Sequence, residues 1–302
     1  MTPSVSAAAA AASVFISAAD GLRLHARCYG RRSAPALPVV CLPGLSRTAE
    51  DFETLAAALA NGPRPMRRVI ALDYRGRGLS AYDRDPANYS FQTELADVLA
   101  ALTALDALPA VIVGTSRGGI LAMLLAALRP SALAGVVLND IGPVIEPKGL
   151  MRIKSYVGKL PQPASYQEAA EILRRLFSAQ FPKLTEADWL VSARRAYRLD
   201  HDRLQPTYDV RLATTLQHVN FDKPLPPLWK EFDALASVPL MVIRGANSDI
   251  LSPETVDAMR RRRPGLELVE VPDQGHAPLL AEADIIARIG DFVARCEPPR
   301  GH

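Results

Sequence analysis

The stretch AVIVGTSRGGILAMLLAAL, residues 110–128, decides how the rest of this 302-residue chain is interpreted. Its first five residues are an apolar run that predicts a strand buried on both faces, and its second half predicts an apolar helix. Between them lies G-x-S-x-G, with Ser116 at its centre. A strand that turns directly into a helix leaves little space beside the turn, and glycine supplies both the small size and the permissive backbone. Such a turn projects the Ser116 hydroxyl beyond the sheet edge, near the free N–H groups that begin the helix.

Apolar runs and helical patterns alternate on both sides of this stretch. Repeated strand–helix units are typical of α/β proteins, and we predict a doubly wound, mostly parallel, eight-stranded sheet. The expected strands are 13–17, 22–28, 38–42, 68–73, 110–114, 133–138, 238–243 and 266–271, and the expected core helices are 49–60, 91–107, 116–128, 253–262 and 281–295.

The alternation stops between residues 144 and 236. Prolines, aromatics and two helical patterns occur there, without a strong strand pattern. We therefore expect a core domain made of residues 13–143 and 237–302, with residues 144–236 forming a helical cap between the sixth and seventh strands. The alanine-rich residues 1–12 are expected to be a flexible leader.

The composition excludes several classes of function. The 35 basic and 32 acidic residues give a net charge of +3, which predicts no nucleic-acid partner. Cys28, Cys41 and Cys296 have unrelated spacings, so neither a disulfide framework nor a zinc site is expected. The leader carries no Lys or Arg before Arg23, unlike a secretory signal, and no apolar run is a convincing membrane span. We expect a cytoplasmic protein.

A serine hydroxyl is a weak nucleophile at neutral pH and needs a base. His276 is the best placed of the histidines, because it follows the last predicted strand, at the sheet edge where Ser116 is also expected. The other four are less well placed: His25 lies in an early strand, His201 and His218 lie in the expected cap, and His302 ends the chain.

Two carboxylates follow predicted strands and could orient this histidine. Asp249 follows strand 238–243, and Asp140 follows strand 133–138. The chain order Ser116, Asp249, His276 matches the order of serine, acid and histidine on this type of sheet, so we predict Asp249 as the acid. Asp140 stays open as a residue that assists or replaces it, or that caps the helix entering the cap or binds loop amides.

Two backbone N–H groups are expected to stabilise the negative oxygen of the reaction intermediate. The first belongs to Arg117, directly after the serine. The second is predicted at Leu45, in the loop after strand 38–42, because Gly44 permits close approach of the backbone.

These motifs resemble those of the α/β-hydrolase fold superfamily over roughly residues 13–293. Residues 73–80, DYRGRGLS, also resemble the D-x-R-G-x-G-x-S segment of many members, where it is a structural loop. The resemblance extends to microbial carboxylesterases and to meta-cleavage C–C hydrolases, which have helical lids. Pro43-Gly44 departs from the His-Gly that many members carry before the oxyanion residue. Haloalkane dehalogenases and epoxide hydrolases of this fold use an aspartate at the elbow, so Ser116 argues against both.

The resemblance implies a serine hydrolase that cleaves carboxylic esters through an acyl-enzyme, with aliphatic polyesters among the candidate substrates. No cofactor or metal is expected, and the partner is a small-molecule ester, bound by a monomer or homodimer. Leu45, Arg117 and Tyr156 are the expected substrate-binding residues, and the cap aromatics Trp189, Tyr197, Tyr208 and Trp229 are weaker candidates. With no convergent cations recognised in the cap, neutral esters are expected.

Two alternatives remain open. A C–C hydrolase of ring-fission products would need inward-facing arginines such as Arg117, Arg152 or Arg194, because those substrates are dianionic. A non-catalytic binding protein of the same fold is the other alternative, and covalent labelling of Ser116 would separate it from an enzyme.

Overall fold

The structure is a computed structural model that describes residues 11–62, 66–217, 219 and 225–298. Nearly all of the expected leader lies outside the described residues, as do His218 and His302.

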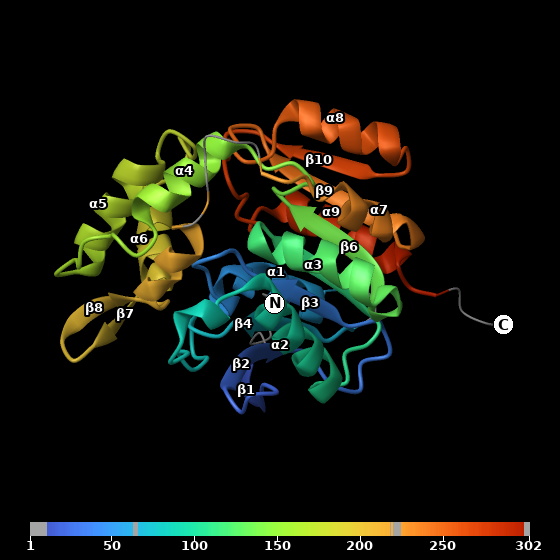
Figure 1. Ribbon diagram of the computed structural model, residues 1–302, viewed down its shortest axis with the longest axis horizontal. Coiled ribbons are helices and arrows are strands. Elements are labelled where there is room, and N and C mark those ends of the chain that lie inside the picture. The colour runs from blue at the N-terminus through green and yellow to red at the C-terminus, as the bar shows by residue number, and fades with distance from the viewer. Residues whose placement is uncertain (1–10, 63–65, 218, 220–224, 299–302) are drawn as a thin grey trace, which may run out of the picture.

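The core is the predicted eight-stranded, mostly parallel sheet, in the order β1-β2-β4-β3-β5-β6-β9-β10 (Figure 1). β2 pairs antiparallel with β1 and β4, and the remaining neighbours are parallel. The carboxyl ends of β5, β6, β9 and β10 therefore meet at one edge, where the loops carrying the candidate site residues begin. The strands are β1 (Ala12–Ser17), β2 (Arg23–Tyr29), β3 (Val39–Leu42), β4 (Val69–Asp73), β5 (Ala110–Thr115), β6 (Leu133–Asn139), β9 (Leu240–Gly245) and β10 (Glu267–Val271).

Helices cover both faces of the sheet, and alternate strand residues enter two separate apolar clusters. In β3, Val40 and Leu42 belong to one cluster, while Val39 and Cys41 belong to the other. Each fully buried apolar side chain of this size contributes roughly 1.5–3 kcal/mol, so the continuous apolar strands hold the helices on both faces. The first cluster includes residues of α2 (Phe91–Ala104), α3 (Arg117–Leu128) and α8 (Pro253–Arg262), and the second includes residues of α1 (Glu53–Asn61) and α9 (Ala283–Arg295).

The segment between β6 and β9 contributes α4 (Pro147–Tyr156), α5 (Tyr166–Phe177), α6 (Glu186–Ala196) and a hairpin of β7 (Tyr197–Asp200) and β8 (Arg203–Pro206). The hairpin differs from the expectation of a purely helical segment. These elements gather at one end of the molecule in Figure 1. Helices α5 and α6 and the hairpin have their own apolar cluster, which includes Leu173, Trp189 and Leu204, whereas Ile153 of α4 belongs to the main core cluster.

The chain returns to the core earlier than residue 236. Leu212 and Leu216 of the 3₁₀ helix η4 (Val210–Leu216) belong to the main core cluster. Helix α7 (Trp229–Asp233) packs against α3, although it lies within the expected cap. By its contacts, the end of residues 144–236 is part of the core.

Side-chain caps start helices α5 and α6 of the inserted segment. Ser165 accepts a hydrogen bond from the Glu168 backbone N–H, and Thr185 forms a capping box with Asp188 ahead of α6.

Among the residues that the structure describes, no helix combines the length and the apolar character that a membrane span requires. The three cysteines are free thiols.

Candidate active site

Ser116 lies at a sharp turn between β5 and α3, with its backbone in the left-handed region at φ = +51°. This conformation is costly for a residue with a Cβ, so the surroundings must hold it. The neighbouring glycines make the turn possible. A Cβ at Gly114 would lie 2.5 Å from the Gly118 oxygen, and a Cβ at Gly118 would lie 2.1 Å from the Leu42 oxygen. Both distances are too short for any side chain.

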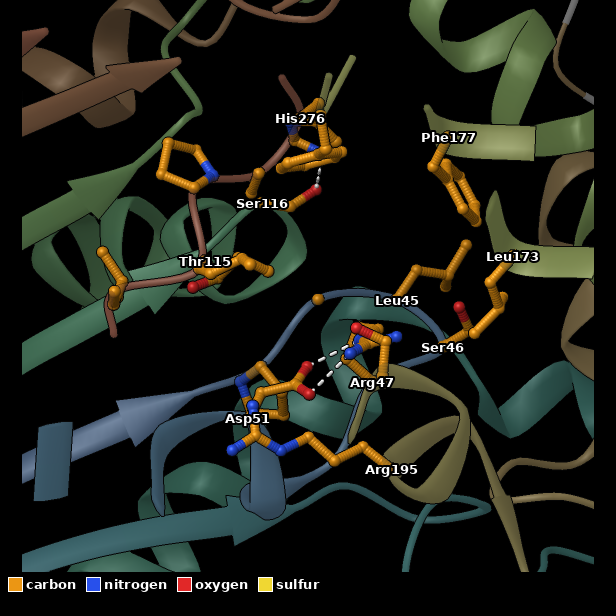
Figure 2. Close-up of a pocket in the computed structure, with 18 of the residues that line it drawn as sticks. Leu45, Ser46, Arg47, Asp51, Thr115, Ser116, Leu173, Phe177, Arg195 and His276 are labelled. Carbon is orange, nitrogen blue, oxygen red and sulfur yellow. Dashed lines mark hydrogen bonds and ion pairs between the residues drawn. The ribbon is translucent and has the colours of Figure 1, made fainter. Parts of the chain in front are cut away.

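His276 meets Ser116 at this turn (Figure 2). Its Nε2 lies 2.8 Å from the Ser116 Oγ, and its Nδ1 lies 2.7 Å from an oxygen of Asp140. The structure therefore brings together Ser116 and His276 as expected, but with Asp140 and not Asp249 as the carboxylate partner. The prediction for Asp249 is wrong on geometry, because its carboxylate is bonded to Arg152.

Asp140 is fully buried and directly follows β6. One oxygen accepts the Gly245 backbone N–H at 2.8 Å, and the other accepts the Ser248 hydroxyl at 2.6 Å. These donors suit an ionised carboxylate, which in turn accepts the Nδ1 proton of His276. The tautomer with Nδ1 protonated leaves Nε2 free to accept the hydroxyl proton of Ser116.

Asp249 instead connects the core to α4. Its two oxygens accept hydrogen bonds from Nε and Nη2 of Arg152 at 2.7 and 2.8 Å. Burial raises the pKa of Asp249, but the hydrogen bonds and charge of Arg152 outweigh it and leave the pKa below its ordinary value. Gly149 packs against this loop so closely that a Cβ there would lie 2.4 Å from the backbone carbonyl oxygen of Asp249.

Asn139 ties the two halves of the site together, a role that the sequence interpretation missed. Its amide donates to the Thr115 hydroxyl at 3.0 Å and to the Pro278 carbonyl at 2.9 Å. It thus links the turn that carries Ser116 to the loop that carries His276. Its place beside Asp140 at a strand end was the only signal in the sequence.

The loop after β3 lies beside Ser116: a Cβ built on Gly44 would be 3.8 Å from the Ser116 Cβ. In the described part of the chain, the backbone N–H groups of Leu45 and Arg117 have no hydrogen-bond partner. Both donors predicted for the oxyanion are therefore available.

Residues of the DYRGRGLS segment hold this loop in place. The Tyr74 hydroxyl donates to the Pro43 carbonyl at 3.2 Å, and Arg77 Nε donates to the Leu45 carbonyl at 2.9 Å. Arg77 is fully buried, so its position is set by packing as well as by hydrogen bonds.

The Arg117 side chain points away from the site, so it is not the inward-facing arginine that the C–C hydrolase alternative would need. Its Nε donates to Glu94 at 2.5 Å, and its Nη2 donates to the Tyr89 carbonyl at 3.0 Å. The guanidinium lies 4.0 Å from the ring centroid of Phe91. Only the backbone of Arg117 remains available to a substrate.

A pocket opens above Ser116 and His276, between the core and the inserted segment (Figure 2). Leu45 and Tyr156 line it, as expected of substrate-binding residues. Of the weaker aromatic candidates, only Trp189 is among its lining residues. Tyr197 is buried in the apolar cluster of the inserted segment, and Tyr208 and Trp229 pack on the core. The other large apolar residues of the wall are Phe52, Ile153, Leu173, Phe177, Phe181, Leu184, Leu279 and Leu280.

The pocket lining also includes two cations, whereas the sequence had suggested no convergent cations in the cap. Arg47 and Arg195 line it, and Arg47 is paired with Asp51 through two bonds of 2.6 Å. The three arginines considered in the sequence are not part of this lining: Arg117 binds Glu94, Arg152 binds Asp249, and Arg194 lies over the ring of Tyr166.

A second Ser–His–Asp set lies on the opposite part of the sheet. His25 Nδ1 is 2.7 Å from Asp73, and its Nε2 is 3.0 Å from the Ser13 Oγ. Asp73 also accepts the backbone N–H groups of Ala49 and Leu79, and it is the cross-strand partner of His25. Because Ser13 lies on an antiparallel edge strand and not at a helix N-terminus, we interpret this set as a cross-strand link.

The described residues contain no cluster of three or more His, Cys, Asp or Glu side chains that could hold a metal ion.

Comparison with known proteins agrees with the fold. Residues 39–289 match the Alpha/beta hydrolase family, and the chain belongs to it. It is similar to an alpha/beta hydrolase from Novosphingobium aromaticivorans, a solved structure that is 40% identical, with a TM-score of 0.85 and coverage of 94% of this chain and 98% of that one.

Two curated relatives have named activities. A 3-hydroxybutyrate-oligomer hydrolase from Cupriavidus necator is 33% identical over 299 residues, covering 92% of this chain and 96% of that protein. An sn-1-specific diacylglycerol lipase from Mus musculus is 28% identical over 249 residues, covering 79% and 74%. The relatives are hydrolases, and the chain is a hydrolase of this family.

Proposed function

We propose that this protein is a carboxylic ester hydrolase that uses Ser116 as its nucleophile. The observation that carries the proposal is the continuous hydrogen-bonded series from Ser116 through His276 to Asp140, with distances of 2.8 and 2.7 Å. Such a series makes a serine hydroxyl reactive at neutral pH, because the imidazole takes its proton as the oxygen attacks.

In the proposed reaction, the Ser116 Oγ attacks the ester carbonyl carbon while His276 Nε2 takes the hydroxyl proton. The backbone N–H groups of Leu45 and Arg117 donate to the resulting oxyanion. The intermediate collapses as the ester C–O bond breaks, and His276 gives its proton to the leaving alkoxide. Water, deprotonated by His276, then attacks the acyl-enzyme and releases the acid and the free serine. Asp140 holds the imidazole and stabilises its cation.

Helices α4, α5 and α6 act as the cap in this proposal, since they supply the apolar wall opposite Ser116. A wall of leucine and phenylalanine side chains fits short aliphatic chains better than highly polar substrates. One curated relative is named for hydrolysis of 3-hydroxybutyrate oligomers, which are aliphatic polyesters. We therefore place short aliphatic esters, including hydroxy-acid oligomers, first among the substrates.

Covalent labelling tests the nucleophile directly. A fluorophosphonate probe should modify wild-type protein at Ser116, as located by peptide mass spectrometry, because only an activated serine attacks it readily. Ser116→Ala should abolish both the labelling and the hydrolysis of 4-nitrophenyl butyrate.

Ser13→Ala is the matched control, because Ser13 also lies within 3.0 Å of a histidine. It should label as wild type does. Labelling that persists in Ser116→Ala and disappears in Ser13→Ala would contradict the assignment, and an unlabelled wild-type protein would favour a non-catalytic binding protein.

A further inference from the structure

One side of α6 faces the pocket with three residues spaced three apart. Trp189, Ser192 and Arg195 all line it, as the helical repeat requires of residues on one face. Trp189 is buried in the apolar cluster of the inserted segment, whereas Ser192 and Arg195 are half-buried. The helix therefore presents an apolar anchor, a hydroxyl and a guanidinium to the same space.

The position of Arg195 is held by the hairpin that follows. Its carbonyl accepts a hydrogen bond from the Thr207 hydroxyl at 3.0 Å, and the Thr207 backbone N–H donates to the Ala196 carbonyl at 2.9 Å. The end of α6 is thus tied to Thr207, the residue that follows β8. In Figure 2 the Arg195 side chain lies at the end of the pocket away from Ser116 and His276.

The charge of Arg195 has no counterpart in the described part of the chain, where its guanidinium has neither a hydrogen bond nor an ion pair. The lining contains two further charged groups, Arg47 and Asp51, and these neutralise one another through a bidentate pair. The Ser192 hydroxyl likewise has no partner among the described residues. Two donors and one net positive charge thus remain in a largely apolar pocket.

Attraction to the negative end of the α6 dipole explains why a cation occurs in the last turn. Arg194 already satisfies this tendency from the exposed side of the helix, over the ring of Tyr166. The dipole does not explain why a second cation is directed into the pocket that contains Ser116. A half-buried guanidinium has lost part of its hydration, and an anion bound in the pocket would replace it.

We propose that Arg195, helped by the Ser192 hydroxyl, binds a carboxylate of the substrate. This inference rests on the proposed esterase function. The planar guanidinium can bind a carboxylate through two parallel hydrogen bonds. A single unpaired guanidinium neutralises one negative charge, so the ligand is expected to be a monoanion. The substrates are esters whose leaving group ends in a carboxylate. The terminal ester of a hydroxy-acid oligomer has this form, because its alcohol side carries the free acid.

The test compares two substrates that differ only in charge: the linear dimer of 3-hydroxybutyrate and the same dimer with its terminal acid converted to a carboxamide. Arg195→Gln should lower kcat/KM for the acid by about 10- to 100-fold, the range of a charged hydrogen-bonded pair. The loss should appear mainly as a higher KM, because the carboxylate is bound equally before and during the reaction. For the carboxamide dimer, kcat/KM should change by less than about 3-fold, since its terminal group is uncharged and forms no ion pair with Arg195.

Arg195→Lys should recover part of the preference for the acid, because it keeps the charge without the fork. Arg194→Gln is the matched control and should leave both substrates unaffected, because Arg194 points away from the pocket.

Equal losses on acid and carboxamide in Arg195→Gln would overturn the proposal, as would a wild-type protein that labels at Ser116 yet cleaves neither dimer. A wild-type protein that fails to label would instead contradict the proposed function itself.

Discussion

Asp140→Asn is expected to lower kcat by about 10,000-fold while leaving the fold intact, the size of loss seen when a serine hydrolase exchanges its triad acid for an amide. The carboxylate of Asp140 accepts three donors: His276 Nδ1, the Gly245 N–H and the Ser248 hydroxyl. An asparagine of the same shape has one oxygen and one NH₂ group. If the NH₂ group turns toward His276, the imidazole proton must move from Nδ1 to Nε2. A protonated Nε2 cannot accept the hydroxyl proton of Ser116. Steady-state kinetics with 4-nitrophenyl butyrate measures the loss.

Asp249→Asn is the control that separates the two carboxylates. It removes the ion pair with Arg152 but no contact of His276, so kcat should fall by less than about 10-fold, with any change arising from a looser α4. Circular dichroism and a thermal unfolding curve should show both variants folded. The opposite ranking, with Asp249→Asn nearly inactive and Asp140→Asn active, would show that the acid moves to Asp249 during the reaction and that the geometry described above is not the reacting one.

The fold could be predicted from the sequence because the buried strands are continuous apolar runs that alternate with helical patterns. The choice between Asp140 and Asp249 could not, since both follow neighbouring strands of one sheet edge. The structure separates them through contacts from far along the chain. Ser248 donates to Asp140, while Arg152 of the inserted segment binds Asp249. One sequence feature agrees with the outcome: Asp140 is the first residue after its strand, whereas Asp249 comes four residues after its own.

The polarity of the pocket escaped prediction for a related reason. Arg194 and Arg195 are adjacent in sequence, so they differ by about 100° around α6. Which of them faces the pocket depends on how α6 is rotated about its axis when it packs on its neighbours. The apolar pattern of a short surface helix does not determine this rotation precisely enough to distinguish adjacent residues. The expectation of neutral esters rested on finding no convergent cations in the cap, whereas the lining of the pocket has a net positive charge.

Glu94→Gln is expected to destabilise the folded protein by about 3–5 kcal/mol, the cost of removing one partner from a buried ion pair. Glu94 is fully buried and bridges two guanidiniums, with Arg77 Nη1 at 2.6 Å and Arg117 Nε at 2.5 Å. The amide neutralises neither cation, so two buried positive charges remain close together. Urea denaturation at pH 7 gives the free energy of unfolding. Glu50→Gln is the matched control, since its pair with Arg27 is partly exposed to solvent, with side-chain exposures of 47% and 23%, and should contribute less than about 1 kcal/mol.

The effect of Glu94→Gln should also depend on pH. Burial raises the pKa of Glu94, but Arg77 and Arg117 outweigh it and hold the pKa below its ordinary value of 4.5. A carboxylate with a lowered pKa stabilises the folded state above the ordinary pKa, and this stabilisation is lost as the pH falls toward the lowered value. The difference between wild type and Glu94→Gln should therefore be constant above about pH 5 and should shrink below pH 4. If the difference in free energy of unfolding does not change across this range, the variant is destabilised by altered packing. The charge of Glu94 would then not be what holds Arg77 and Arg117 in place.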